Sequence, residues 1–210
     1  MDLYKKGLMI VISGPSGVGK DAIKKQLLKK INNDLFYSIS YTTREPRRGE
    51  KEGKDYFFIN KEDFKNKIRE NFFIEYNIFL NNYYGTAYKQ ILQKLEEGKK
   101  ILLEIDIEGA LKIREHKVNK DCVFIFIAPS SKEVLYKRLK KRNTETDQEL
   151  NKRMLRADEE MKLAYKYDYI VINDEIDNAV NKIISILSAE HSKTKNIINF
   201  YLKEILQKGN

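Results

Sequence analysis

Residues 8–31 read LMIVISGPSGVGKDAIKKQLLKKI, and this stretch decides the fold. It begins with an apolar run that is typical of a buried strand and continues into a glycine-rich turn. After the turn, Ile23, Leu27 and Ile31 recur at the spacing of one helix face. A strand, a glycine turn and a helix in this order are the context in which a phosphate-binding loop is expected.

The turn GPSGVGKD, at 14–21, has the phosphate-loop spacing G-x-x-x-x-G-K through Gly14, Gly19 and Lys20. Glycines allow backbone N–H groups to turn toward a phosphate, and the helix N-terminus adds positive potential. Lys20 would reach the β and γ oxygens of a bound nucleotide. The residues predicted to bind ATP here are Gly14, Pro15, Ser16, Gly17, Val18, Gly19, Lys20 and Asp21.

Asp21 stands where the motif asks for a serine or threonine hydroxyl, and Ala22 offers no substitute. A carboxylate can ligate Mg²⁺, which makes Asp21 the candidate metal ligand, but it also brings negative charge close to the phosphates. An acid in the first turn of a helix stabilises the empty fold. The sequence leaves the balance open, and we expect a loop that binds ATP with an unusual Mg²⁺ dependence.

Three further runs, at 101–105, 122–128 and 169–172, are apolar almost throughout, which is typical of strands covered on both faces. Helical patterns lie between and after them. This alternation predicts an α/β fold, with a P-loop core whose parallel sheet is flanked by helices. Ligands are then expected beyond the carboxyl ends of the strands.

Two segments interrupt the alternation. Residues 36–88 hold short β-like pieces around a helix that Asn60 is expected to cap, so they are predicted to form an inserted α+β lobe. The core is then made of 1–35 and 89–210. A polar stretch within 138–152 suits a lid.

Lys and Arg number 40 against 31 Asp and Glu, a net charge of +9 that suits a polyanionic partner. No basic, aromatic-lined motif demands nucleic acid, and no apolar run approaches the roughly 18 residues of a membrane span. Cys122 is the single cysteine, which excludes an internal disulfide. The first residues are unlike a signal peptide, so with no membrane span the cytoplasm is the default expectation. The apolar stripe of the final residues is expected to dock on the core or on a second subunit, which leaves a homodimer open.

Five separated stretches carry a resemblance to a known family. They are GPSGVGK, SYTTREPRRGEKEGKDYFF, FIEYNIFLNNYYGTAY, LLEIDIEGA, and RLKKR with NKRMLRADEEM and YDYIVIND. Together they span about residues 7–188, and the chain resembles guanylate kinases, which transfer a phosphoryl group from ATP to GMP. The resemblance implies a kinase of one domain, with GMP in the lobe, ATP in the loop and Mg²⁺ as cofactor.

The resemblance also implies an acceptor site. Its GMP-binding residues would be Ser38, Arg44, Arg47, Tyr56, Glu75, Tyr84, Thr86, Glu104 and Asp106. Guanidinium groups and phenols suit the GMP phosphate. Glu75 would accept the neighbouring N1–H and amine of guanine, whereas adenine would leave this acid unpaired. Ser38 and Thr86 would bind the base from either side.

Glu104 and Asp106 follow a buried strand, where acids are costly unless they are used or paired. By resemblance, Asp106 would orient the GMP base and the water shell of Mg²⁺, with Glu104 as a helper. Pairing with a nearby arginine is an equal alternative for Glu104.

Arginines in and after the lid are the expected catalysts, because in-line phosphoryl transfer needs charge neutralised around the moving group. The predicted catalytic set is Lys20, Arg44, Arg138, Arg142 and Arg153. In the family, residues matching Arg142 and Asn173 stack on adenine and bind its edge. A solvated helical face is the alternative for these arginines.

A rival from another class is a guanylate-kinase-like module that binds phosphopeptides without reacting. Such modules typically carry a degraded glycine loop, whereas Lys20 and the loop glycines are present here. A kinase for another nucleoside monophosphate is disfavoured by Glu75 with Thr86. The leading hypothesis is therefore an ATP-dependent guanylate kinase.

Overall fold

The computed structural model describes residues 7–31, 34–79, 81–116, 118, 122–141, 147–200 and 202. Its strands are β1 (Leu8–Ser13), β2 (Leu35–Tyr37), β3 (Tyr41–Thr42), β4 (Phe57–Phe58), β5 (Phe73–Phe79), β6 (Asn82–Ala87), β7 (Lys100–Glu104), β8 (Cys122–Pro129) and β9 (Tyr169–Asn173). Its helices are α1 (Lys20–Ile31), α2 (Lys61–Arg69), α3 (Tyr88–Glu96), α4 (Ile107–Glu115), α5 (Lys132–Lys140), α6 (Asp147–Lys162), α7 (Ile176–His191) and α8 (Thr194–Phe200).

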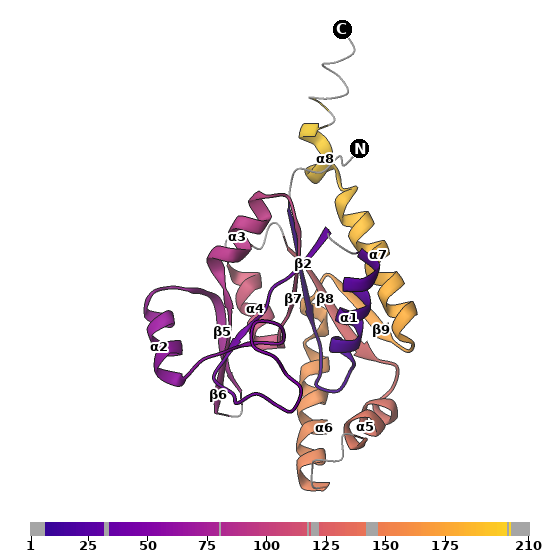
Figure 1. The fold of residues 1–210 in the computed structure, drawn as a ribbon. Coiled ribbons are helices and arrows are strands. Elements are labelled where there is room, and N and C mark those ends of the chain that lie inside the picture. Colours follow the sequence, from indigo (N-terminus) through magenta and orange to yellow (C-terminus); the bar gives the residue numbers. More distant parts are fainter. Residues whose placement is uncertain are drawn as a thin grey trace.

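A parallel five-stranded sheet in the order β2-β7-β1-β8-β9 forms the centre of the molecule (Figure 1). All six residues of β1 are buried, because this strand lies in the middle of the sheet and is covered on both faces. Along β1, Ile10 and Ile12 pack with one set of helices, and Met9 and Val11 pack on the opposite face. The predicted strand, glycine turn and helix are confirmed.

Helices cover both faces of this sheet. On one face, α1 contributes Ile23 and Leu27, and α7 contributes Val180 and Ile183, to a core with the strands. On the other face, α3 and α4 bury Ile91, Ala110 and Ile113 against the sheet. The α/β fold class predicted from the apolar runs is therefore confirmed.

Strand β9 is an exception to the expectation that every apolar run is covered on both faces. Its side chains Ile170 and Ile172 are 57% and 47% exposed, whereas Val171 is buried in the core. These two side chains are exposed because β9 is an edge strand, which pairs with β8 alone among the described strands. The prediction of a doubly covered strand at 169–172 was wrong for this edge.

The inserted lobe contains a second sheet, in the order β4-β3-β6-β5, with α2 packed beside it. Phe64 of α2 is fully buried and stacks on Phe73, with ring centroids 4.4 Å apart. One boundary needs correction. Strand β2, which includes residues 36 and 37 of the predicted lobe, pairs with β7, so these two residues belong to the core sheet.

Helices α5 and α6, which contain the two ends of the predicted lid, pack on each other through Leu135, Leu139 and Leu150. On α6, the Arg156 guanidinium lies 4.3 Å from the ring centroid of Phe79, so this helix contacts the inserted lobe. Residues 142–146 of the predicted lid lie outside the described residues.

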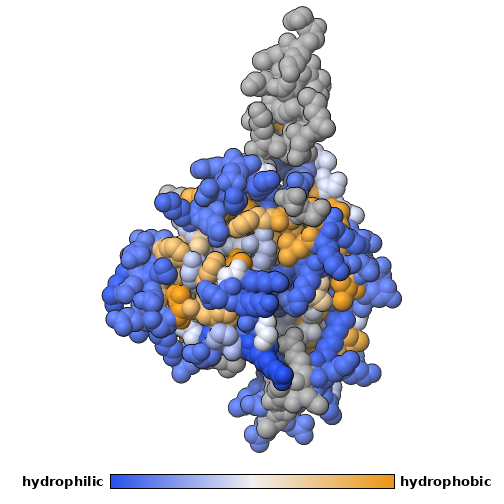
Figure 2. Space-filling model, in the orientation of Figure 1, coloured by the Kyte–Doolittle hydropathy of each residue, from blue (hydrophilic) through white to orange (hydrophobic). Residues whose placement is uncertain are grey.

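Figure 2 shows hydrophilic residues gathered over α2 and apolar residues nearer the centre of this face. Within the residues that the structure describes, no helix is long and apolar enough to cross a membrane.

The N-cap of α2 gives a test of the lobe. The Asn60 side chain accepts a hydrogen bond of 2.8 Å from the backbone N–H of Asp63, as predicted. Asn60→Ala should lower the free energy of unfolding by about 1 kcal/mol, because that N–H loses its partner. Asn60→Asp should keep the cap. Urea denaturation measures both, and equal losses in the two variants would contradict the capping role.

Candidate functional site

The glycine loop connects β1 to α1 at the carboxyl edge of the core sheet. Gly14 has φ +146°, and a Cβ there would lie 2.2 Å from the Ile127 carbonyl oxygen. No other residue type fits this approach between the loop and β8. Lys20 folds back over the loop, and its Nζ donates to the carbonyl oxygens of Gly14 at 2.6 Å and Pro15 at 3.2 Å.

Two side chains from distant elements hold the loop at the Val18 carbonyl oxygen. Asn173, at the end of β9, donates to it through Nδ2 at 2.7 Å. Arg138 of α5 donates to it through Nη1 at 3.0 Å, and its Nη2 donates to the Asn173 carbonyl oxygen at 3.1 Å. The structure thus brings both predicted residues to the loop. Asn173 is 1% exposed and contacts the backbone of the loop, a contact that the sequence did not indicate.

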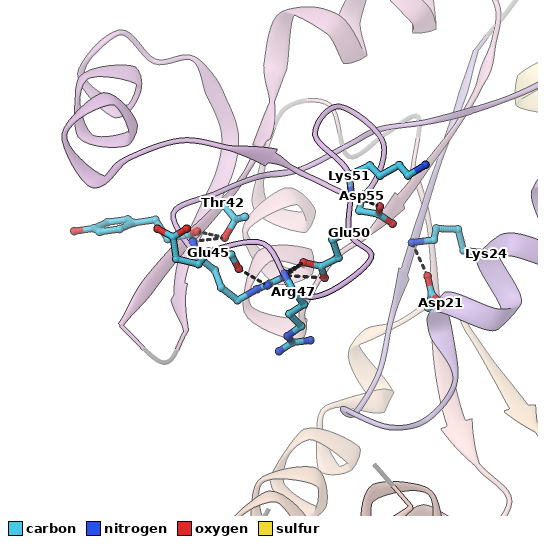
Figure 3. A network of polar contacts seen from close by, with 10 residues as sticks. Asp21, Lys24, Thr42, Glu45, Arg47, Glu50, Lys51 and Asp55 are labelled. Carbon is cyan, nitrogen blue, oxygen red and sulfur yellow. Dashed lines mark hydrogen bonds and ion pairs between the residues drawn. The ribbon is translucent and has the colours of Figure 1, made fainter. Parts of the chain in front are cut away.

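Asp21 lies in the first turn of α1, and its carboxylate pairs with two lysines, of which Figure 3 draws Lys24. Oδ1 lies 3.0 Å from Nζ of Lys24, and Oδ2 lies 2.8 Å from Nζ of Lys25. Partial burial raises the pKa of Asp21, but hydrogen bonds from Lys25 and Lys24 outweigh it, and the pKa lies below its ordinary value. Asp21 is therefore ionised at neutral pH, and the positive charges of Lys24 and Lys25 offset its negative charge.

Each carboxylate oxygen of Asp21 faces a lysine, so a Mg²⁺ ion at this side chain would compete with Lys24 and Lys25. Within the described ranges, no group of three or more His, Cys, Asp or Glu side chains is arranged to hold a metal ion. The assignment of Asp21 as a ligand stays a prediction.

Arg44 lies in the inserted lobe with the aromatic residues that were predicted to accompany it. Its guanidinium is 5.4 Å from the ring centroid of Tyr56, and the rings of Tyr56 and Tyr84 meet edge to face at 6.1 Å. Burial raises the pKa of the Tyr56 phenol, which keeps it a neutral donor. These three side chains form one cluster of donors.

Glu50 is the partner of Arg44 that the sequence reasoning missed. Both of its carboxylate oxygens accept from Arg44 Nη2 at 2.9 Å, and Oε2 also accepts from the backbone N–H of Arg47 at 2.7 Å. Arg44 Nη1 donates to the Glu45 carbonyl oxygen at 2.7 Å. The guanidinium is thereby fixed in place. The Arg47 side chain is exposed and points away from this loop (Figure 3).

Glu75 lies on β5 and is 6% exposed, which is unusual for an acid. Its Oε1 accepts a hydrogen bond of 2.5 Å from the Thr86 hydroxyl, so the predicted pair is in contact. A Cβ on Gly109 of α4 would lie 2.6 Å from Oε2, so a larger residue there would force the Glu75 side chain to shift. Burial raises the pKa of Glu75 to about 7, and the nearby Asp106 adds to the effect while Thr86 lowers it.

Asp106 caps α4, because its Oδ1 accepts from the backbone N–H of Gly109 at 2.8 Å. Its Oδ2 accepts from Nδ2 of Asn77 at 2.8 Å. Ser38 is 2% exposed, and its hydroxyl has no hydrogen-bond partner within the described part of the chain. A buried hydroxyl without a partner is available to a ligand. Glu104 forms an ion pair with Lys24 at 2.9 Å. The alternative of a paired acid therefore holds for Glu104, although its partner is a lysine and not an arginine.

The predicted residues thus form two groups. Around the glycine loop lie Lys20, Asp21, Arg138 and Asn173, and on the lobe side lie Ser38, Arg44, Tyr56, Glu75, Tyr84, Thr86 and Asp106. Arg153 is half-buried on α6, and Arg142 lies outside the described residues. The missed residues are Lys24, Glu50, Asn77 and Gly109. Lys24 had a weak signal in its i, i+3 spacing from Asp21, whereas the other three depend on contacts across the fold.

A phosphate loop at the carboxyl edge of a parallel sheet, with an arginine-bearing helix beside it and a lobe that offers polar donors, defines a P-loop phosphotransferase. The Guanylate kinase family model matches residues 6–190. The chain belongs to the guanylate kinase family.

Relatives of known name are similar to this protein along nearly its whole chain. A guanylate kinase of Onion yellows phytoplasma (strain OY-M) is 50% identical over 209 residues, covering 100% of this chain and 98% of the relative. A guanylate kinase of Clostridium tetani is 48% identical, covering 92% of this chain and 91% of the relative. The crystal structure of guanylate kinase from Anaplasma phagocytophilum matches with a TM-score of 0.78 at 31% identity, covering 97% and 98% of the two chains.

The buried acid gives a stability test with a defined sign. Because the folded pKa of Glu75 lies above its ordinary value, Glu75 contributes stability that is lost as pH rises toward about 7. Glu75→Gln should therefore be up to about 3 kcal/mol more stable than wild type at pH 8 and nearly unchanged at pH 5. Chemical denaturation at both pH values measures this. A Glu75→Gln variant that is less stable at pH 8 would contradict the raised pKa.

Proposed function

We propose that the protein transfers the γ-phosphoryl group of ATP to GMP, giving ADP and GDP. The observation that carries the proposal is the Glu75 carboxylate, which is buried beside Thr86 and Gly109 at the lobe side of the site. Guanine presents two adjacent donors, its N1–H and its exocyclic amine, which a carboxylate accepts together. A buried acid without such a partner is costly, so its burial suits a guanine ligand.

The glycine loop would hold the phosphates of ATP, and Lys20 would leave the Gly14 and Pro15 carbonyls to reach the β and γ oxygens. Arg138 donates to the Val18 carbonyl oxygen of the loop and would offset charge on the moving phosphoryl group. Arg142 and Arg153 are proposed to join it when the lid closes. Closure would also exclude water, which otherwise competes with GMP as acceptor.

At the acceptor end, Arg44 and Tyr56 with Tyr84 would bind the GMP phosphate, and Arg47 would complete the set. Glu50 orients Arg44 while leaving the guanidinium with further N–H donors. Ser38 and Asp106 would position the base. The Asn173 amide is already bound to the loop, so its proposed contact with adenine would come from its Oδ1, which has no partner among the described groups.

Mg²⁺ is proposed to enter with ATP, held by phosphates and water and offsetting their negative charge. The cytoplasm and a homodimer likewise stay proposals, and the homodimer rests on the apolar stripe near the C-terminus. A phosphopeptide-binding module is disfavoured, because Lys20, the loop glycines and Arg138 are all in place around the loop.

The direct test is ADP production by the purified protein, with GMP, AMP or UMP as acceptor, across a Mg²⁺ titration. We expect turnover with GMP and little with AMP or UMP, because neither base offers the paired donors that Glu75 needs. Lys20→Met is the control, since it removes the loop cation. GMP binding without turnover at any Mg²⁺ concentration would favour the binding module.

The same carboxylate predicts a pH dependence. Glu75 accepts both guanine donors only when it is ionised, and its pKa of about 7 makes it neutral in acid. The kcat/KM for GMP should therefore fall about tenfold per pH unit below pH 7 and level off above it. The KM for ATP should change much less over this range. A flat GMP profile between pH 5.5 and 8 would show that Glu75 does not bind the base.

A further inference from the structure

Lys24 lies one turn into α1, and its ammonium joins three separate elements of the core. Nζ lies 3.0 Å from Asp21 Oδ1 on α1 and 2.9 Å from Glu104 Oε2 at the end of β7. It also donates to the Tyr37 hydroxyl at the end of β2, at 3.4 Å. The side chain is only 15% exposed, and its ammonium also lies 4.7 Å from the centroid of the Tyr37 ring.

The charges around Lys24 keep it a cation. Burial lowers the pKa of Lys24, but the attraction of Glu104 and Asp21 outweighs burial and raises the pKa above its ordinary value. Burial and the Glu104 charge raise the pKa of Tyr37, so this phenol stays neutral. One ammonium therefore faces two carboxylates and a neutral hydroxyl.

The location of this cluster links the two halves of the proposed site. Asp21 directly follows the loop lysine, where ATP phosphates would lie. Glu104 ends β7, and burial together with the Glu104 charge raises the pKa of Tyr56 in the lobe. An unbalanced carboxylate at position 21 would repel the phosphates. Lys25 also pairs with Asp21, but its side chain is 71% exposed and its pairing is screened by solvent.

We propose that Lys24 is a positioning residue for phosphoryl transfer, which offsets Asp21 beside the ATP phosphates and fixes Glu104 at the acceptor edge. This inference rests on the proposed function. It accounts for how a loop with an acid in place of the usual hydroxyl can still bind ATP. It also gives Asp21 a role as the partner of Lys24 in place of direct metal ligation.

Two matched variants, Lys24→Met and Lys25→Met, test the inference. Each removes one lysine partner of Asp21, but only Lys24→Met also removes the lysine partner of Glu104. Lys24→Met should weaken ATP binding about tenfold or more and also lower kcat, because two carboxylates lose their buried cation. Lys25→Met should change either value by no more than about twofold. Calorimetry with ATP in EDTA and steady-state kinetics give the two readouts.

A second substitution separates the two roles of Lys24. Asp21→Ser in the Lys24→Met background should restore ATP binding in EDTA, because the unpaired carboxylate beside the phosphates is gone. It should leave kcat low, because Glu104 still lacks its partner. Lys24→Arg should retain ATP binding, since the charge remains. Asp21→Ser alone is expected to fold and to bind ATP in EDTA at least as tightly as wild type.

Several outcomes would overturn the inference. Equal effects of Lys24→Met and Lys25→Met would do so, as would a Lys24→Met variant that loses thermal stability while its kcat and ATP affinity stay at wild-type values. If Lys24→Met does not fold, weaker ATP binding by Asp21→Ser would count against the role given to Asp21. A wild-type protein without GMP-dependent ADP production would instead contradict the proposed function.

Discussion

The burial of one carboxylate, that of Glu75, is the constraint on which the site depends. It lies where β5 of the inserted lobe meets α4 of the core, and it is satisfied by Thr86 from the next strand. Gly109 leaves room for the carboxylate, because a Cβ there would lie 2.6 Å from Oε2 and force it to shift. The lobe therefore accepts an energetic cost in the empty protein, and a base with two adjacent donors would repay it.

Around the glycine loop, polar groups on distant elements are likewise joined by hydrogen bonds and ion pairs in the protein without a ligand. Val18 is held by Asn173 and Arg138, so β9 and α5 fix the shape of the loop. Lys24 connects the start of α1 with the end of β7. Such preorganisation lowers the cost of ordering the site during phosphoryl transfer. The same Lys24 ion pair places a positive charge beside the acid at position 21.

The sequence predicted the architecture because buried parallel strands leave a local signal, an unbroken apolar run. The sequence did not place β2 in the core sheet, because three residues are too few to show a periodicity. It also did not show that one face of β9 is exposed, because an edge strand can be as apolar as a central one. Site residues such as Glu75 were recognised from residue types that match a known family. Their partners Glu50, Asn77 and Lys24 were missed, because each contact forms only when the chain folds and none belongs to a phosphate-loop pattern.

The most direct measurement is calorimetric titration of the wild-type protein with GMP, IMP and AMP at pH 8. IMP keeps the N1–H donor of guanine and lacks the amine, whereas AMP offers Glu75 no donor at N1. If the Glu75 carboxylate selects the base, affinity should fall in the order GMP, IMP, AMP, with a loss at each step. Equal affinity for GMP and AMP would contradict the role of Glu75 and with it the assignment of the lobe as a guanine site.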